Sequence, residues 1–212
     1  MNNIYKVAIT GNSGSGKSLA CRYLKDKGIP IIDADLIARI TVDEDITLRH
    51  ALSKAFGDDV LCEDGSLNRK ELAKRAFSTK DNKSIMDGIL HPKIIENISK
   101  EIQKLSEAGS RICVVEAAAL FESGFIGIFD FLILITAEHN HKLKRIMVRD
   151  GISKEDAETR LKAQTLDDDI ETFADLVIEN SGEENEFINK LKRAILIIND
   201  KAERFLNERG IK

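Results

Sequence analysis

The chain has 212 residues, which is enough for one substantial core with a small inserted subdomain and too few for two large independent domains. Hydrophobic residues make up 42% and charged residues 32%, and the apolar stretches are far too short to span a bilayer, so the composition excludes a membrane protein. A formal net charge of −4 argues against non-specific binding to nucleic acid, because recognition of a phosphate backbone relies on a basic face.

The first predicted element is a strand over residues 6–10, and a glycine-rich loop follows it directly. Residues 11–18 read Gly-Asn-Ser-Gly-Ser-Gly-Lys-Ser, a complete match to the pattern G-x-x-x-x-G-K-[S/T], and a helical pattern follows. The glycines allow backbone N–H groups to converge on polyphosphate oxygens, Lys17 places a positive charge near the β and γ phosphates, and the Ser18 hydroxyl can ligate Mg²⁺. The chain is therefore predicted to bind ATP or another nucleoside triphosphate with Mg²⁺. The predicted nucleotide-binding residues here are Gly11, Asn12, Ser13, Gly14, Ser15, Gly16, Lys17, Ser18 and Leu19.

The second predicted strand, residues 30–32, is followed by Asp33. Ligands of open α/β folds bind at the carboxyl edge of the sheet, where Asp33 would lie. A carboxylate there can accept the proton of an alcohol that attacks the γ-phosphorus. Aspartate is also a good helix cap, so Asp33 or Asp35 would equally serve a helix that begins near Leu36. The residues alone leave both roles open.

About eighty mostly helical residues separate the second predicted strand from the third, far more than one crossover helix needs. We expect them to form an inserted helical subdomain that faces the substrate, over about residues 36–109. Pro92 is predicted to begin a helix, because proline is tolerated at the first helical position and disfavours helical dihedrals in the preceding residue. His91 would then lie at the N-terminus of that helix.

The third predicted strand, residues 112–116, ends in Glu116. Proteins with this phosphate-binding loop often keep an acidic residue near the Mg²⁺ ion at this point, although a purely structural carboxylate fits the sequence nearly as well. Glu122 follows in the next loop, where it could face either solvent or the substrate.

A pair of arginines follows the fourth predicted strand, residues 131–136. Arg145 and Arg149 are four residues apart and would share one face of a helix. Guanidinium groups stabilise the charge that spreads over a phosphoryl group during its transfer. The competing interpretation is a solvated charged face.

A second helix is predicted over residues 155–164, after a break at Gly151 and Ser153. It carries Arg160 and Gln164, which are again four residues apart. The two helices are predicted to form a mobile lid over the nucleotide, spanning about residues 138–169.

The last predicted elements are a strand over residues 175–178 and a long packing helix over residues 183–209. Short apolar runs that alternate with helices indicate an α/β protein whose five-stranded parallel sheet is flanked by helices.

Several motifs, in this order, resemble those of bacterial dephospho-CoA kinases over nearly the whole chain. They are the phosphate loop, Asp33-Ala34-Asp35, His91-Pro92, Leu120-Phe121-Glu122, Arg145 with Arg149, Arg160 with Gln164, Ala174-Asp175 and Asn180-Ser181-Gly182. Enzymes of that family transfer the γ-phosphoryl group of ATP to the ribose 3′-hydroxyl of dephospho-CoA, the last step of coenzyme A synthesis. The resemblance implies a P-loop kinase fold with a core of residues 1–35, 110–137 and 170–212.

The resemblance also implies roles for single residues. Asp33 would be the catalytic base, acting with Lys17, Arg145 and Arg149. Asn180 and Gly182 would lie near the adenine of ATP, and the helical insertion would help to receive the CoA moiety. The residues expected to contact the acceptor are Asp33, His91, Glu122, Arg160 and Gln164. Mg²⁺ would be held by Ser18 through the phosphates, with Glu116 as a further candidate.

The chain departs from the family pattern at two places. Glu116 and Ala118 stand where the family usually has aspartate and proline, and Asn12 and Leu19 stand where glycine and threonine are frequent. The changes at Asn12 and Leu19 remove no phosphate-binding group. Asparagine at position 12 suits a loop because it tolerates left-handed dihedrals better than most residues.

Two other functions fit parts of the pattern. A nucleoside or nucleotide kinase would share the core and the lid but would phosphorylate a different acceptor. A regulatory P-loop NTPase would need guanine-reading and switch motifs, and neither D-x-x-G nor [N/T]-K-x-D occurs. Because no secretory signal is visible at the N-terminus, we expect a cytoplasmic protein. We also expect a monomer or weak homo-oligomer that acts on a small-molecule substrate.

Overall fold

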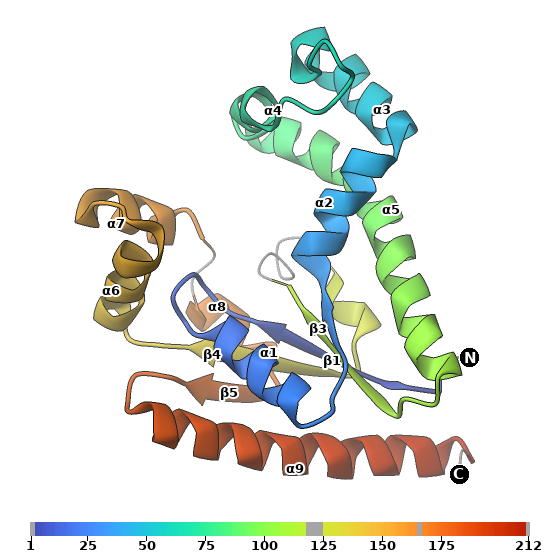
Figure 1. The fold of residues 1–212 in the computed structure, drawn as a ribbon, viewed down its shortest axis with the longest axis vertical. Helices are drawn as coiled ribbons and strands as arrows, with labels where there is room; N and C mark the ends of the chain where they lie inside the picture. Colours follow the sequence, from blue (N-terminus) through green and yellow to red (C-terminus); the bar gives the residue numbers. More distant parts are fainter. Residues whose placement is uncertain (1–2, 118–124, 165–166, 211–212) are drawn as a thin grey trace. The chain divides into compact units, whose positions relative to one another are not determined.

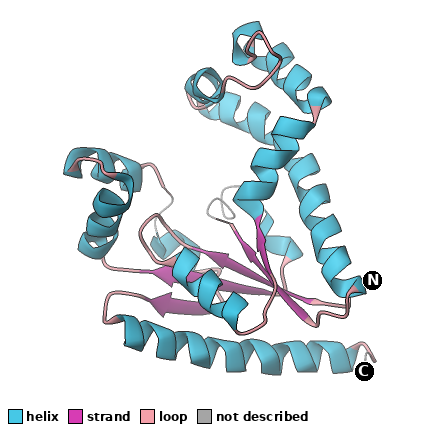
Figure 2. Ribbon diagram, viewed as in Figure 1, coloured by secondary structure: helices cyan, strands magenta, loops and turns pink. Residues whose placement is uncertain are grey.

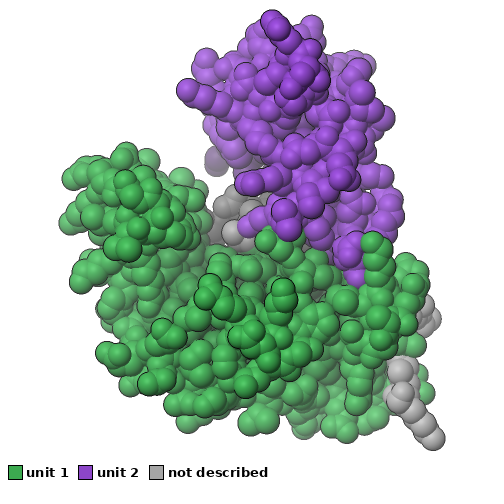
Figure 3. Space-filling model, viewed as in Figure 1, with its two compact units in different colours: residues 1–33, 102–212 green, residues 34–101 purple. Residues whose placement is uncertain are grey.

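The computed structural model describes residues 3–117, 125–164 and 167–210, and the chain divides into two compact units. The sheet unit combines residues 1–33 with residues 102–212, and the helical unit comprises residues 34–101 (Figure 3). The helical unit begins directly after Asp33, so the candidate base belongs to the sheet unit.

The sheet unit is built on a parallel sheet that has five strands within the described residues, in the order β2-β3-β1-β4-β5 (Figures 1 and 2). These strands are β1 (Tyr5–Thr10), β2 (Ile31–Asp33), β3 (Ile112–Glu116), β4 (Phe131–Thr136) and β5 (Leu176–Glu179). The predicted α/β fold with a five-stranded parallel sheet is confirmed. Because β1 is the central strand, the loop that follows it opens at the middle of the sheet's carboxyl edge.

Two helices, α1 (Lys17–Asp26) and α9 (Glu184–Glu208), cover one face of this sheet (Figure 1). Their apolar side chains pack against alternate strand residues, among them Val7 and Ile9 of β1 and Ile133 of β4. Complete burial of a large apolar side chain contributes about 1.5–3 kcal/mol. This packing anchors α1 and therefore the glycine-rich loop that leads into it.

The helical unit contains three complete helices and most of a fourth. They are α2 (Ala34–Glu44), α3 (Ile46–Phe56), α4 (Arg69–Ala76) and α5 (Lys80–Glu107), with the short 3₁₀ helix η1 (Asp58–Val60) between α3 and α4. Side-chain caps fix two of the helix starts: Asp45 accepts hydrogen bonds from backbone amides at the start of α3, and Asn68 does so for α4. This unit has its own apolar core, formed by Val42, Leu52, Phe56, Val60, Leu72 and Ala76.

The prediction that Pro92 begins a helix is wrong. Pro92 lies inside the continuous helix α5, and His91 is an interior residue of the same helix. A proline in a helix interior removes one backbone hydrogen bond and costs about 3 kcal/mol. The buried residues Ile94, Ile98 and Ile102 follow it at helical spacing, and their burial stabilises the uninterrupted helix.

Two helices joined by a tight turn follow β4, as predicted. Helix α6 (His139–Asp150) ends at Gly151, which has a φ of +65°, and α7 (Lys154–Lys162) begins where Ser153 accepts a hydrogen bond from a backbone amide. Leu143, Ile146, Ala157 and Leu161 form the apolar contact between the two helices. The 3₁₀ helix η2 (Phe125–Ile128) precedes β4, and the short helix α8 (Asp167–Glu171) precedes β5. Over the described ranges, no helix combines the length and the apolar character needed to cross a membrane.

Candidate active site

The loop between β1 and α1 has a backbone that only glycine accommodates at three positions. Gly11, Gly14 and Gly16 have φ values of +145°, +78° and +106°. A Cβ atom at Gly11 would lie 2.0 Å from the backbone oxygen of Ile135, and one at Gly16 would lie 2.1 Å from Nδ2 of Asn180. Asn12 does not have a positive φ, so its tolerance of left-handed dihedrals is not what allows it to replace glycine.

The start of α1 offers backbone donors to an anion. The N-cap residue of α1 is Gly16, which has no side chain and therefore cannot cap the first amides of the helix. The N-terminus of a helix carries a partial positive charge and binds phosphate readily. Lys17, the first residue of α1, folds its side chain back so that Nζ donates to the backbone oxygen of Gly11. The Ser15 hydroxyl is buried, and no hydrogen-bond partner for it is present among the described residues.

Two carboxylates end neighbouring strands at the same edge of the sheet. Asp33 of β2 is paired in register with Glu116 of β3, and Glu116 is also paired with Ile9 of β1. Asp33 is exposed, and Oε1 of Glu116 lies 3.4 Å from the Ser18 hydroxyl. Because α2 begins immediately after Asp33, a capping role for this residue stays open beside the catalytic one.

The oxygen atoms of Ser18 and Glu116 suit Mg²⁺. This ion is usually bound in proteins through one or two carboxylates together with substrate phosphates, and it keeps several water ligands. The part of the chain that the structure describes contains no cluster of three or more His, Cys, Asp or Glu residues able to hold a metal.

Arg145 and Asn180 both hold the glycine-rich loop. The Arg145 guanidinium donates to the backbone oxygen of Gly14 at 3.1 Å and to that of Asn180 at 2.8 Å. The buried Asn180 side chain donates to the backbone oxygen of Ser15 at 2.8 Å. These contacts bring residues of α6 and of the turn after β5 to the loop.

The other two arginines of the predicted lid make different contacts. Arg149 donates to Asp150 at 2.7 and 2.9 Å, and Arg160 donates to the same carboxylate at 2.6 Å. The paired guanidinium groups hold the pKa of the Asp150 carboxyl below its usual value. Their side chains remain 55% and 50% exposed, so both arginines remain accessible to a ligand while Asp150 joins α6 to α7.

Asp167 contacts several of these elements, and the sequence did not identify it as a site residue. The Asp167 carboxylate accepts hydrogen bonds from the Asn12 side-chain amide at 2.7 Å and from the Thr136 hydroxyl and the Lys142 ammonium at 2.6 Å each. Gln164, which the resemblance places near the acceptor, accepts a hydrogen bond from the Ser13 amide at 2.9 Å. No local pattern identifies Asp167, because Asn12 precedes it by 155 residues.

The remaining predicted site residues have other surroundings. His91 lies 3.4 Å from Asp87 within α5, and burial lowers its pKa. Gly182 is in the turn before α9. Glu122 lies outside the described residues.

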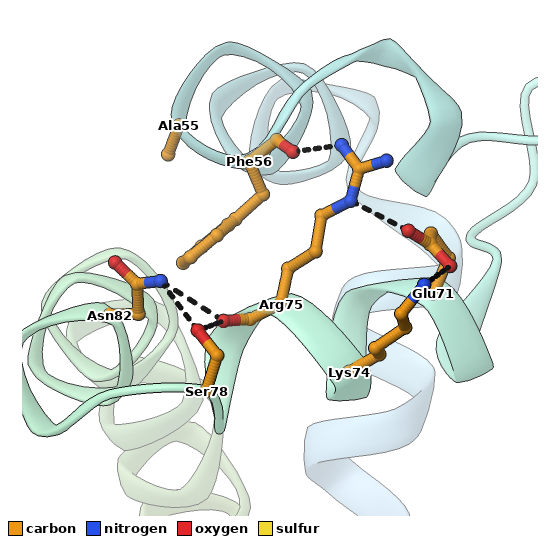
Figure 4. Close-up of a pocket in the computed structure, with 7 residues that line it drawn as sticks. All are labelled: Ala55, Phe56, Glu71, Lys74, Arg75, Ser78 and Asn82. Atoms are coloured by element: carbon orange, nitrogen blue, oxygen red, sulfur yellow. Dashed lines mark hydrogen bonds and ion pairs between the residues drawn. The ribbon is translucent and has the colours of Figure 1, made fainter.

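The helical unit contains a pocket of about 480 Å³ between α3, α4 and α5 (Figure 4). Within it, Arg75 donates to Glu71 at 2.7 Å, and the Asn82 amide donates to the Ser78 hydroxyl at 3.0 Å. The Arg75 guanidinium also donates to the backbone oxygen of Phe56 in α3 at 2.5 Å, and the Asn82 amide of α5 donates to the backbone oxygen of Arg75 in α4 at 3.1 Å. These two contacts connect the three helices around the pocket (Figure 4).

The comparisons with known proteins agree on one family. A family model for dephospho-CoA kinase (CoaE) matches residues 5–186. The dephospho-CoA kinase of Listeria innocua is 32% identical over 96% of this chain and 98% of its own, and that of Corynebacterium diphtheriae is 35% identical over 83% and 88%.

Solved structures extend the agreement to the fold. The dephospho-CoA kinase from Campylobacter jejuni matches with a TM-score of 0.67 and 30% identity over 93% of this chain and 98% of its own. The Thermus thermophilus protein TT1252 matches with a TM-score of 0.80 and 27% identity over 92% and 97%. A shikimate kinase from Acinetobacter baumannii, 10% identical with a TM-score of 0.53, shares the fold alone. The chain belongs to the dephospho-CoA kinase family.

Proposed function

We propose that this chain transfers the γ-phosphoryl group of Mg²⁺-bound ATP to the ribose 3′-hydroxyl of dephospho-CoA, with Asp33 as the base. The observation that carries the proposal is the shared sheet edge, at which the phosphate loop follows β1 and Asp33 and Glu116 end the two strands beside it. An in-line phosphoryl transfer requires hydrogen-bond donors that hold the phosphates and a base that accepts the hydroxyl proton, both fixed on the same rigid edge.

The proposed step is a single displacement. The 3′-oxygen forms a bond to the γ-phosphorus while the bond between that phosphorus and the β–γ bridging oxygen breaks, so ADP leaves. The hydroxyl proton passes to the carboxylate of Asp33. Lys17 and the first amides of α1 orient the triphosphate and neutralise its charge.

The arginines supply the remaining positive charge. Arg145 is already fixed on the phosphate loop, whereas Arg149 and Arg160 sit on Asp150 with their side chains half exposed. We assign Arg149 to the transferring phosphoryl group and Arg160 to the acceptor, and we propose that α6 and α7 form the lid over the nucleotide. Asn180 and Gly182 are assigned to the adenine side of the nucleotide, and His91 and Glu122 to the CoA side.

Ser18 and Glu116 would hold Mg²⁺. The ion supplies neutralisation of the charge that develops on the β- and γ-phosphate oxygens.

The experiment compares wild-type protein with Asp33→Asn. Product formation from ATP and dephospho-CoA is followed by mass detection, and a panel of nucleosides and nucleotides is tested as alternative acceptors. Asp33→Asn is isosteric and removes the base, so turnover is expected to fall by orders of magnitude at nearly unchanged ATP affinity. Wild-type protein that phosphorylates a nucleoside or nucleotide and leaves dephospho-CoA untouched would overturn the proposed acceptor, and a fully active Asp33→Asn variant would overturn the proposed base.

A further inference from the structure

We propose that Asp167 is a positioning residue that holds the phosphate loop in its ATP-binding conformation. Its carboxylate receives hydrogen bonds from Asn12 of the loop, from Thr136 at the end of β4 and from Lys142 of α6, all between 2.6 and 2.7 Å. It therefore links three elements that surround the nucleotide site.

The ion pair makes Asp167 a firm anchor. The side chains of Lys142 and Asp167 are only 11% and 14% exposed, so solvent screens the pair little. Charge-assisted hydrogen bonds are roughly twice as strong as neutral ones, and loss of one partner leaves the other charge buried and uncompensated. Because Lys142 and Thr136 fix the carboxylate, its remaining oxygen can fix the Asn12 side chain.

Helix α6, which carries Lys142, also constrains the loop at Gly14. The backbone of Lys142 packs against Gly14 so closely that a Cβ atom there would lie 2.5 Å from the Lys142 oxygen. Between these two contacts, the Ser13 amide donates to Gln164 at 2.9 Å. Three consecutive loop residues are thus held by side chains or backbone of the segment from Lys142 to Asp167.

This arrangement predicts that loss of the Asp167 carboxylate weakens the binding of ATP and leaves the binding of the acceptor unchanged. A loop that is already ordered binds phosphate without a further loss of conformational entropy. Removal of the Asp167 carboxylate removes its hydrogen bond to the Asn12 side chain, so more of the ordering of the loop has to come from the bound nucleotide. The three side chains that donate to the Asp167 carboxylate are those of Asn12, Thr136 and Lys142, and none of these is a candidate residue for the acceptor.

The inference rests on the proposed function, because it takes the loop to be the triphosphate site. The test compares the steady-state kinetics of Asp167→Ala with those of Asp169→Ala. The second variant is the matched control, because it removes an exposed carboxylate from the same short helix. For Asp167→Ala we expect the KM for ATP to rise on the order of tenfold, because one favourable hydrogen bond is lost. The KM for dephospho-CoA should stay within about twofold of the wild-type value. Asp169→Ala should match the wild type in both constants.

A double-mutant cycle with Asn12→Ala separates positioning from general destabilisation. If Asp167 acts through Asn12, the single change Asn12→Ala raises the KM for ATP, and adding it to Asp167→Ala has little further effect. Additive effects of the two changes would contradict the coupling. Asn12→Ala leaves no buried charge behind, so it tests the same contact if Asp167→Ala does not fold.

The outcomes for the two proposals are distinct. A wild-type protein that makes no CoA from ATP and dephospho-CoA refutes the proposed function itself. An active wild type with an unchanged KM for ATP in folded Asp167→Ala overturns only the role of Asp167. Equal increases in both KM values would also overturn it, because they would indicate a general loss of structure.

Discussion

At the scale of single residues, Gly16 is a loop position where an added side chain would collide with another side chain of the site. Its φ of +106° is strained for any other residue, and the Asn180 amide occupies the space that a Cβ would need. Asn180 cannot move away at low cost, because it is buried and donates to the backbone oxygen of Ser15. We expect Gly16→Ala to lower ATP affinity by at least about tenfold, measured by calorimetry with Mg²⁺-ATP.

The matched control is Gly28→Ala, at the other end of α1. Gly28 also has a positive φ, +82°, but no heavy atom lies within 4 Å of the position of its Cβ. This variant should lose stability through backbone strain and keep wild-type affinity for ATP. Equal losses of affinity in both variants would show that strain alone, without the contact to Asn180, explains the effect.

The three cysteines should differ in reactivity. Burial raises the pKa of Cys113 to about 12, and burial together with the neighbouring Glu116 raises the pKa of Cys21 well above its usual range. A raised pKa lowers the thiolate fraction at any pH below it, and the thiolate is the reactive form. Cys62 is exposed. At pH 8 a maleimide should therefore modify the native protein at Cys62 alone and all three residues in denaturant, as peptide mass mapping can determine. Rapid modification of native Cys21 would contradict the buried position described for it.

At the scale of elements, Asn68 sets the start of α4. Its side chain accepts a hydrogen bond from the Glu71 amide, one of the first amides of the helix. Asn68→Ala should lower the free energy of unfolding by about 1 kcal/mol, measured by urea denaturation. Asn68→Asp keeps the acceptor and should retain most of the stability. If both substitutions cost the same, the capping hydrogen bond does not contribute to stability.

The helices and strands also show where local sequence patterns are sufficient to predict secondary structure. The strands were predictable because each is a short apolar run, and the turn between α6 and α7 was predictable because Gly151 and Ser153 are strong local signals. Pro92 misled the same reasoning, since its local preference for a helix start is outweighed by burial of the apolar residues that follow it in α5. Local propensity decides an element only where tertiary packing does not oppose it.

At the scale of the whole molecule, the sequence predicted which residues lie at the carboxyl edge and did not predict how they are held. The positions of Asp33 and Glu116 follow from strand order and strand ends, which apolar patterning reveals. The contacts of Asp167 with Asn12 and Lys142 depend on how α6 and α8 pack around the loop. Such contacts join distant residues and have no periodic signature, so only the folded structure reveals them.

The division into two units bears on how ATP stabilises the protein. All candidate nucleotide-binding residues belong to the sheet unit, and the helical unit has a separate apolar core. A ligand that binds only the native state at about one hundred times its Kd adds about 2.7 kcal/mol of stability, or roughly 5–10 °C for a chain of this size.

We therefore expect Mg²⁺-ATP alone to raise the unfolding temperature by roughly that amount in a thermal scan. Hydrogen exchange should show new protection at the loop and the start of α1, with the core of the helical unit, around Leu52 and Leu72, unchanged. Lys17→Ala provides the control, because loss of the ammonium should abolish most of the shift. A shift of equal size in that variant would place the nucleotide elsewhere, and protection confined to the helical unit would contradict the assignment of ATP to the sheet edge.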